Sequence, residues 1–505
     1  MKTILRKFYR LNFIFISLLI GASCQKVSDD NHSGSSDVGP SHYLSDTVLS
    51  DEFRELSRSI LTDDFVSGIL ETRHRSPRND QKVLVVGGGV AGLVASLEAF
   101  KNNSESVTMI EKRKSYSRSI VMRLDEKNLN YIESLTGSGN FERLIHSGWL
   151  LKPGPGHPPA KRIIVLKKLE YLLAYLAESV SKKDPSLKIH YGYKFDGQVS
   201  DDGDFKLIPS SSGSGSALIC PTDYLIGADS AHSEVTKYLN LRSRNTSNIS
   251  YAGIINYSNL DVNGSQIVDP KSWQDDQYVP LWNDLNRRID FLLNLISGGW
   301  DPLDISGQNY GDLPRVRMFV TGDLIYMARE FTKREFDLIE SQTDPELKRS
   351  RAETMLKLSA GFYFGHQGQA LTPLKDKIDI AVFPVQLTRV TPGVAQVLNS
   401  ANNKKVSGIV IGDARATTHF FTGTGVNIAI EHAVVAGAYR TDDGLDFLNL
   451  LDAFMNRDVS LMHLKSAGSE GSPPDARGDS GFLSLDRTSL LGINADSYTF
   501  RELLN

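Results

Sequence analysis

The stretch VLVVGGGVAGLVASLEAF, Val83–Phe100, joins an uninterrupted apolar run to three glycines and then to a segment of helical periodicity. An apolar run that stops at glycines is typical of a strand buried on both faces of a parallel sheet. The following residues predict a helix over 93–103, and SVTMIEKR, 106–113, predicts a second strand. Strand, glycine turn, helix and strand within about thirty residues form a βαβ unit. The sequence therefore predicts an α/β fold.

The glycines of this turn match the pattern GxGxxG of dinucleotide-binding loops. The first glycine makes the turn, the second admits a diphosphate, and the third lets helix and strand pack closely. The next helix directs its free N–H groups at the diphosphate. Glu111 ends the second strand some twenty residues on, where a carboxylate binds ribose and disfavours a 2′-phosphate, so NAD or FAD is expected rather than NADP. A surface charge is the alternative for Glu111. The cofactor-binding residues predicted here are Gly87, Gly89, Ala91, Gly92, Glu111 and Lys112.

A second motif lies far downstream in GIVIGDARATTHFFTGTGVNIAIEHAVVAG, 408–437. It resembles the GD motif of class A flavoprotein monooxygenases of the p-hydroxybenzoate hydroxylase type, GDAAHxxxPxxGxGxN. The resemblance implies that the cofactor is FAD, that Asp413 contacts its ribityl chain, and that a glycine-rich turn carries the flavin ring. By this resemblance the cofactor-binding residues are Gly412, Asp413, Gly423, Thr424, Gly425, Val426 and Asn427.

Two further segments extend the resemblance. YLIGADSAHSEVTKYL, 224–239, is similar to the family motif GADGxxSxxR, which implies that Asp229 lies near the FAD diphosphate. Ser230 replaces the usual glycine and Thr236 the usual arginine, and both departures weaken the case for rapid NAD(P)H use. EKRKSYSRSIVMRL, 111–124, resembles the flavin domains of MICAL proteins, which implies that Arg118 and Lys167 approach the cofactor. Solvated basic side chains are the alternative for both.

The motifs and the patterns between them predict a domain plan. The resemblance implies a Rossmann-like FAD-binding domain of the GR2 or p-hydroxybenzoate hydroxylase type with an inserted antiparallel β-sheet substrate domain. Alternating apolar and polar residues predict that sheet over 251–382. Its candidate pocket residues are Arg317, Tyr326, Arg329 and Phe362–Phe364, with core packing as the alternative. The FAD-binding domain is predicted over 51–250, with N-terminal helices, and over 383–465, with a C-terminal helix, before a flexible tail over 466–505.

The N-terminus begins with the basic segment MKTILRKFYR and continues with the apolar run LNFIFISLLIGAS. This order predicts a signal peptide over 1–23. Cys24 follows GAS as in a loose lipobox, which predicts a lipid-anchored protein of the cell envelope with a disordered tether over 25–50. Membrane contact is expected only through this signal or lipid anchor. Ordinary cleavage and an uncleaved anchor are the alternatives, and a cytoplasmic location follows if the segment is not a functional signal.

The composition and the absence of certain motifs exclude several functional classes. A net charge of −4 gives no indication of a nucleic-acid partner. Neither of the two cysteines forms a CxxC, so disulfide reductases are excluded, and no tryptophan lies in the WxWxIP segment of flavin halogenases. The eleven histidines form no HExxH pattern, and no metal site is predicted.

The remaining interpretation is an FAD-dependent monooxygenase-like oxidoreductase acting on an unknown organic small molecule. The resemblance implies that NAD(P)H reduces FAD and that molecular oxygen then forms a flavin hydroperoxide, which oxygenates the substrate. His419 and Phe420 are the candidate catalytic residues because they lie in the predicted flavin loop, with a solvent-facing histidine as the alternative for His419. A catalytically degenerate flavin-binding envelope protein, or an FAD oxidase or dehydrogenase on the same fold, stays open.

Overall fold

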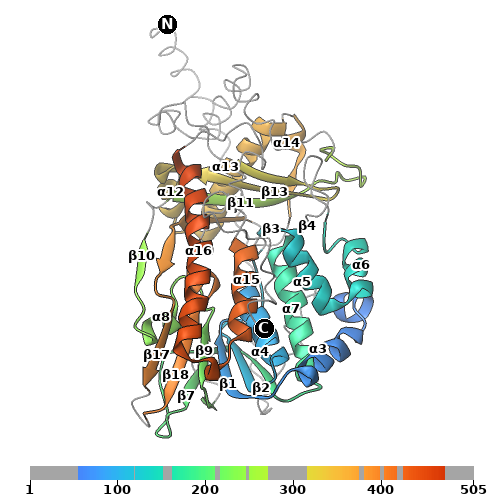
Figure 1. The fold of residues 1–505 in the computed structure, drawn as a ribbon. Coiled ribbons are helices and arrows are strands. Elements are labelled where there is room, and N and C mark those ends of the chain that lie inside the picture. The colour runs from blue at the N-terminus through green and yellow to red at the C-terminus, as the bar shows by residue number, and fades with distance from the viewer. Residues whose placement is uncertain are drawn as a thin grey trace, which may run out of the picture. The chain divides into compact units, whose positions relative to one another are not determined.

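The computed structural model describes residues 55–118, 120–151, 162–210, 216–245, 250–270, 316–364, 366–374, 380–398, 403–417 and 425–471 (Figure 1). The predicted signal peptide, Cys24, the tether and most of the predicted tail lie outside these ranges. His419, Phe420, Gly423 and Thr424 lie outside them too. Within these ranges no helix combines the length and apolar character needed to cross a bilayer.

The main sheet contains the predicted βαβ unit. Its six strands run in the order β17–β18–β9–β1–β2–β5. Their bounds are β1 Asn79–Val86, β2 Ser104–Glu111, β5 Leu187–Tyr191, β9 Tyr224–Gly227, β17 Val394–Leu398 and β18 Lys405–Val410. All neighbouring pairs are parallel except β17 with β18. Both faces are buried, because Val83 and Val85 enter one apolar core while Leu84 and Val86 enter another.

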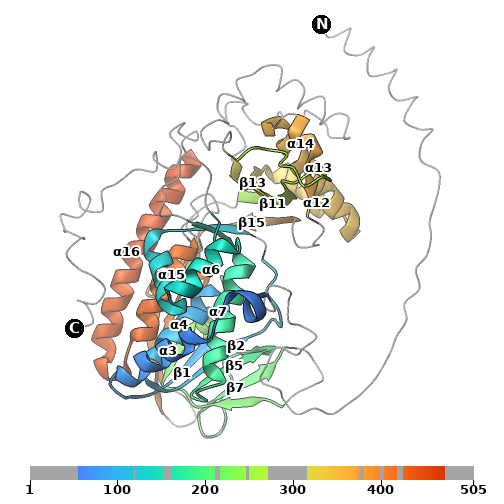
Figure 2. The same cartoon turned by 90° about the vertical axis from the view of Figure 1, so that its right-hand side faces the viewer.

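Helices cover one face of this sheet. They are α3 Asp64–Arg75, α4 Val90–Lys101, α7 Leu166–Ser181 and α15 Gly425–Ala438. Figure 2 shows α3, α4 and α7 side by side over β1, β2 and β5. Helix α4 is apolar nearly all round because α7 and α15 pack on it from two sides. The other face is covered by the small antiparallel sheet of β6 Tyr193–Lys194, β7 Phe205–Pro209 and β8 Leu218–Cys220, and by α8 Glu234–Tyr238.

Shorter elements complete this part of the chain. A single turn, η2 Leu56–Ile60, precedes α3. The strands β3 Val121–Leu124 and β4 Arg162–Val165 pair antiparallel, and α5 Glu126–Thr136 and α6 Ser138–His146 lie between them in the sequence. The turn η4 Gly412–Ala414 follows β18, and η6 Thr441–Asp443 leads into α16. Helix α16 spans Gly444–Gly471, so the first residues of the predicted flexible tail are helical.

The middle of the chain forms the predicted antiparallel sheet. Its strands are β11 Ser250–Ser258, β12 Val316–Val320, β13 Leu324–Phe331, β14 Thr372–Pro373 and β15 Ile380–Val385. One face packs on α12 Lys333–Glu340 and α13 Pro345–Phe364, which α14 His366–Ala370 follows. On the other face Ile254 and Tyr326 pack against Val121 and Ile163 of the β3–β4 hairpin. The antiparallel pair of β10 Ser243–Asn245 and β16 Thr388–Val390 lies at the two chain crossings into this sheet.

Candidate functional site

Two of the three motif glycines serve backbone packing. Gly87 has φ +105°, a left-handed conformation that favours glycine, and a Cβ there would lie 2.3 Å from the Ala228 carbonyl oxygen. A Cβ on Gly92 would lie 1.7 Å from the carbonyl oxygen of Gly87. A side chain at either position would therefore collide with the backbone, and both glycines are required to form the turn.

Gly89, the glycine expected to admit the diphosphate, has a different environment. It is the N-cap of α4, and no side chain caps this helix. A Cβ on Gly89 would lie 3.0 Å from Arg118 Nη2 and 3.6 Å from Glu170 Oε1, with no backbone atom among its nearest neighbours. The uncapped N–H groups at this helix start provide a positive dipole end where Arg118 adds a positive charge. This arrangement fits an anionic group such as a diphosphate.

Glu111 is held as an anion at the end of β2. The residue is 4% exposed, and its carboxylate accepts hydrogen bonds from Gly88 N (2.8 Å), Arg113 N (2.9 Å) and Arg113 Nε (2.9 Å). Burial opposes the charge, but the contacts with Arg113 and Gly88 outweigh it and lower the pKa of Glu111. The neighbouring Lys112 side chain is exposed. Glu111 therefore ties the glycine turn to β2, and its contact with a ribose stays a prediction.

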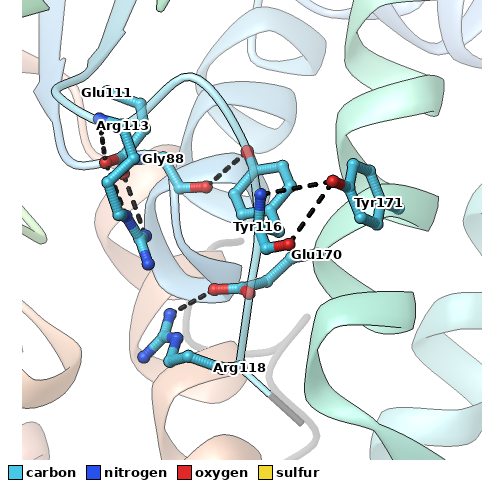
Figure 3. Close-up of polar contacts among 7 residues, drawn as sticks. All are labelled: Gly88, Glu111, Arg113, Tyr116, Arg118, Glu170 and Tyr171. Atoms are coloured by element: carbon cyan, nitrogen blue, oxygen red, sulfur yellow. Dashed lines mark hydrogen bonds and ion pairs between the residues drawn. The ribbon is translucent and has the colours of Figure 1, made fainter. Parts of the chain in front are cut away.

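Arg118 forms an ion pair with Glu170 at the mouth of the glycine turn (Figure 3). Glu170 lies on α7 with its side chain 0% exposed, whereas Arg118 is 37% exposed. Burial raises the pKa of Glu170, and the positive charge of Arg118 opposes that rise. The predicted cofactor residue Lys167 lies in the first turn of the same helix, and its backbone N–H donates to the Arg118 carbonyl at 2.9 Å.

The sequence did not predict three side chains that surround the glycine turn: Arg113, Tyr116 and Glu170. Tyr116 Oη donates to the Gly88 carbonyl at 2.8 Å, and its backbone N–H donates to Tyr171 Oη at 3.3 Å, so it braces the turn against α7 (Figure 3). A signal for Glu170 was present, because this acidic residue interrupts the apolar stripe of the α7 sequence.

The GD segment meets the first motif directly. Gly412 has φ +57°, and a Cβ there would lie 3.1 Å from the Cβ of Ala91 on α4. The Asp413 side chain is exposed on the turn η4. Burial raises the pKa of Asp413, and the charge of Arg118 opposes the rise. A cavity beside η4 is lined by Gly412, Ala416, Gly425, Ile428, Ala429, His432 and Val459.

The side chains at the start of α15 are committed to packing. Asn427 is 8% exposed, its Oδ1 accepts from Asp125 N and Asn128 Nδ2, both at 3.1 Å, and its Nδ2 donates to the Arg123 carbonyl at 2.9 Å. Val426 lies in the main core. These contacts leave the backbone as the group that a cofactor could meet at both positions, and Gly425 begins the helix.

Asp229 shapes the turn after β9. Its Oδ2 accepts from Glu234 N at 2.7 Å and Val235 N at 3.4 Å, so the carboxylate holds the start of α8. Burial raises the pKa of Asp229. The next residue, Ser230, has φ +81°. This left-handed backbone explains why the family motif has glycine at that position.

A Ser230→Gly variant is expected to raise the free energy of unfolding by about 0.5–1 kcal/mol, because a left-handed serine costs about 1–2 kcal/mol and the greater chain freedom of unfolded glycine cancels part of the gain. Urea denaturation measures the change. Ser147, with φ −78°, provides the control. Ser147→Gly is expected to lower stability, and a loss of stability in both variants would contradict the strain at Ser230.

The candidate pocket residues of the antiparallel sheet are core residues where the structure describes them. Arg329 is 3% exposed and pairs with Glu335 of α12 at 2.7 Å. Tyr326 is buried and stacks on Phe319, and Phe364, the last residue of α13, packs in the core between this helix and the sheet. For these three the core-packing alternative holds. The side chains of Arg317, Phe362 and Tyr363 lie outside the described part of the chain.

A second buried carboxylate lies further along α7. Glu178 is 5% exposed, and burial raises its pKa to about 7. It neighbours Tyr191, whose ring packs edge to face on Tyr116 with ring centroids 6.4 Å apart. The folded protein thus binds a proton at Glu178 over a pH range in which the unfolded chain releases it.

Glu178→Gln is expected to stabilise the protein above pH 7 by up to about 3 kcal/mol, because one pKa unit corresponds to about 1.4 kcal/mol. The sign follows from the raised pKa: the charged carboxylate costs stability, and this cost grows from pH 4.5 to about 7. Below pH 4.5 both states are protonated and the gain is expected to disappear. Urea denaturation at pH 4 and pH 8 tests this, with the exposed Glu142→Gln as control. Equal effects of Glu178→Gln at both pH values would contradict it.

No protein-family model matches the chain, and no curated protein matches it. Among solved structures, CmlS, a flavin-dependent halogenase, is similar with a TM-score of 0.51 and 16% identity over 79% of this chain. The chain spans 66% of that halogenase, just under two thirds.

Two other solved structures are similar at lower scores. A mutant of MHPCO, 2-methyl-3-hydroxypyridine-5-carboxylic acid oxygenase, has a TM-score of 0.48 and 14% identity, covering 79% of this chain and 94% of that one. A complex of aklavinone-11 hydroxylase with FAD and aklavinone has a TM-score of 0.48 and 14% identity, covering 78% and 69%.

Identities this low bear on the fold alone. The parallel Rossmann-like sheet with an inserted antiparallel sheet, together with the similarity to CmlS, confirms the predicted fold class. The chain therefore shares its fold with CmlS.

Proposed function

We propose that the chain binds FAD and acts as an oxidoreductase of the monooxygenase type. The observation that carries this proposal is the meeting of two motifs more than three hundred residues apart in sequence. Gly412 packs on Ala91, and Arg118 lies against Gly89 while its charge acts on Asp413. In a parallel α/β sheet, ligands bind outside the carboxyl ends of the strands, which is where these residues lie.

Each part of the site suits one part of FAD. The uncapped start of α4 and Arg118 would hold the diphosphate, Glu111 the ribose of the adenosine, and Asp413 the ribityl chain. Bound FAD would supply the redox and oxygen-transfer chemistry, with NAD(P)H as the source of electrons. The substrate class stays open as a small organic molecule.

A flavin-binding protein without turnover is the second candidate. The observation that favours it is Thr236, which stands where the family has arginine and is 7% exposed on α8. A buried threonine offers no positive charge to the phosphates of NAD(P)H. An oxidase or dehydrogenase that uses another electron donor is compatible with the same site.

The place of action is also a proposal. Residues 1–23 and Cys24 support export and lipid anchoring in the cell envelope, and metabolic labelling with a radioactive fatty acid of the chain and of Cys24→Ser tests the anchor. The local resemblance of 111–124 to MICAL domains supports the cofactor role of Arg118 and carries no substrate with it.

The visible spectrum of the purified full chain, recorded without oxygen before and after NADPH, tests the proposed function. A flavin spectrum that bleaches with NADPH supports a monooxygenase, and substrates are then sought by stimulated NADPH consumption in oxygen. A flavin spectrum that persists supports the second candidate or another donor. Absence of flavin after reconstitution with FAD would overturn the proposal.

A further inference from the structure

Glu170 has an unusual place for a carboxylate. Its side chain is fully buried on α7, one oxygen pairs with Arg118, and the other oxygen, Oε2, has no hydrogen-bond partner among the described residues. A buried carboxylate oxygen without a partner carries a large desolvation cost. Such a group persists where a ligand or a proton satisfies it in another state of the protein.

The pair lies where the diphosphate of FAD is expected. A Cβ on Gly89 would lie 3.0 Å from Arg118 Nη2 and 3.6 Å from Glu170 Oε1, so both groups lie against the start of α4. A diphosphate bound there would attract Arg118 and repel an ionised Glu170 at short range. Two anions would then compete for one guanidinium.

We propose that Glu170 is a positioning residue that holds Arg118 at the diphosphate site, and that it takes up a proton when a bound diphosphate replaces it as the partner of Arg118. This inference rests on the proposed FAD site. In the cofactor-free protein Glu170 keeps the long, half-exposed Arg118 side chain across the mouth of the turn. In the loaded protein the neutral acid places no charge beside the diphosphate, and its new hydroxyl can donate a hydrogen bond.

Other charged groups face this pair, and their chemistry singles out Glu170. Arg113 and Glu111 lie on the β2 side, and the pKa of Glu111 is lowered, so that carboxylate stays ionised near neutral pH. The pKa of the buried Tyr116 is raised well above its usual value, so that hydroxyl stays neutral. Asp413 is the remaining acid, and its pKa is raised by burial as well. A proton taken up on binding therefore resides on Glu170 or Asp413, and variants can separate the two.

The sign of the pH effect follows from the ion pair. The positive charge of Arg118 opposes the rise that burial causes in the pKa of Glu170. Transfer of Arg118 to the diphosphate removes this opposition, so the pKa rises further in the loaded protein. Binding then takes up protons, and affinity falls as pH rises, by up to about tenfold per pH unit for one proton.

Calorimetric titration of the flavin-free full chain with FAD tests this, between pH 6 and pH 8 and in two buffers of different ionisation enthalpy. For the wild type we expect uptake of up to about one proton per FAD and a Kd that rises with pH. Glu170→Gln is isosteric and cannot titrate. It is expected to bind FAD about tenfold more tightly than the wild type at pH 8, with a Kd independent of pH.

Glu178→Gln is the matched control, because it makes the same change at another buried position of α7, about two turns beyond Glu170. It is expected to keep the proton uptake and the pH dependence of the wild type. Loss of proton uptake in Glu170→Gln but not in Glu178→Gln supports the inference.

Several outcomes would overturn it. FAD binding to the wild type without proton uptake does so whether or not any variant folds. Retained uptake in Glu170→Gln does so too, as does loss of uptake in Asp413→Asn alone or weaker binding of Glu170→Gln at every pH. If the wild type binds no FAD at all, the proposed function fails and the inference fails with it.

Discussion

A Gly89→Val variant is expected to remain folded and to bind FAD at least about a hundredfold more weakly, because two lost charge-assisted hydrogen bonds correspond to about 3 kcal/mol or more. Gly89 has φ −73° and ψ −176°, which valine adopts without strain. Its nearest neighbours are the far ends of two side chains, which can move aside. The added methyl groups would instead occupy the space in front of the α4 N–H groups, where the diphosphate must approach.

Flavin fluorescence quenching gives the Kd, and circular dichroism confirms the fold. Gly139→Val is the matched control, because Gly139 is exposed on α6 and its Cβ would meet nothing within 4 Å. This control is expected to bind FAD normally. Gly92→Ala marks the other limit, since its Cβ would lie 1.7 Å from the Gly87 carbonyl oxygen, and it is expected to lose the fold. Wild-type affinity in Gly89→Val would contradict the cofactor assignment.

The sequence predicted what depends on local pattern. The strand and the glycine turn lie where the apolar run and the glycines put them, and β1 is buried on both faces. The helix α4 spans Val90–Lys101, so it begins three residues earlier and ends two residues earlier than the predicted 93–103. The fold class followed from the order of the motifs. The motif also implied different roles for Gly87 and Gly89. The structure identifies the Ala228 carbonyl oxygen as the atom that a side chain at Gly87 would strike.

Contacts between residues far apart in the chain could not be predicted from the sequence. Nothing in the spacing of residues 118 and 170 shows that an arginine before β3 meets a glutamate on α7, because that contact depends on how the helix packs on the sheet. Asn427 was assigned to the cofactor by resemblance, yet its amide is bonded to the β3–α5 connection. A sequence motif gives the residue type at a position but does not determine which groups that residue contacts.

Arg415 is the least expected side chain of the GD segment. It stands where the family motif has a second alanine, and it is 0% exposed. Its Nη2 pairs with Asp452 Oδ1 of α16 at 2.7 Å, and the same oxygen accepts from Gly393 N at 2.8 Å. Asp452 thus links α16, the start of β17 and the GD segment in one buried contact. A substitution of Asp452 therefore tests this contact.

Asp452→Ala is expected to lower the free energy of unfolding by about 3–5 kcal/mol, because it leaves the buried Arg415 guanidinium without its counter-charge. Urea denaturation at pH 7 measures the loss, and the exposed Asp446→Ala in the first turn of the same helix is expected to cost no more than about 1 kcal/mol.

The double variant Arg415→Ala with Asp452→Ala decides the cause. Removal of the stranded charge is expected to recover part of the stability lost in Asp452→Ala, since residues in one buried pair are strongly non-additive. A loss in Asp452→Ala as small as that in Asp446→Ala would contradict a structural ion pair. A displacement of Arg415 is expected to move Asp413 as well, because the two residues are only two positions apart in the chain. Reduced FAD affinity in Asp452→Ala, recovered in the double variant, would therefore show that α16 supports the flavin site from behind.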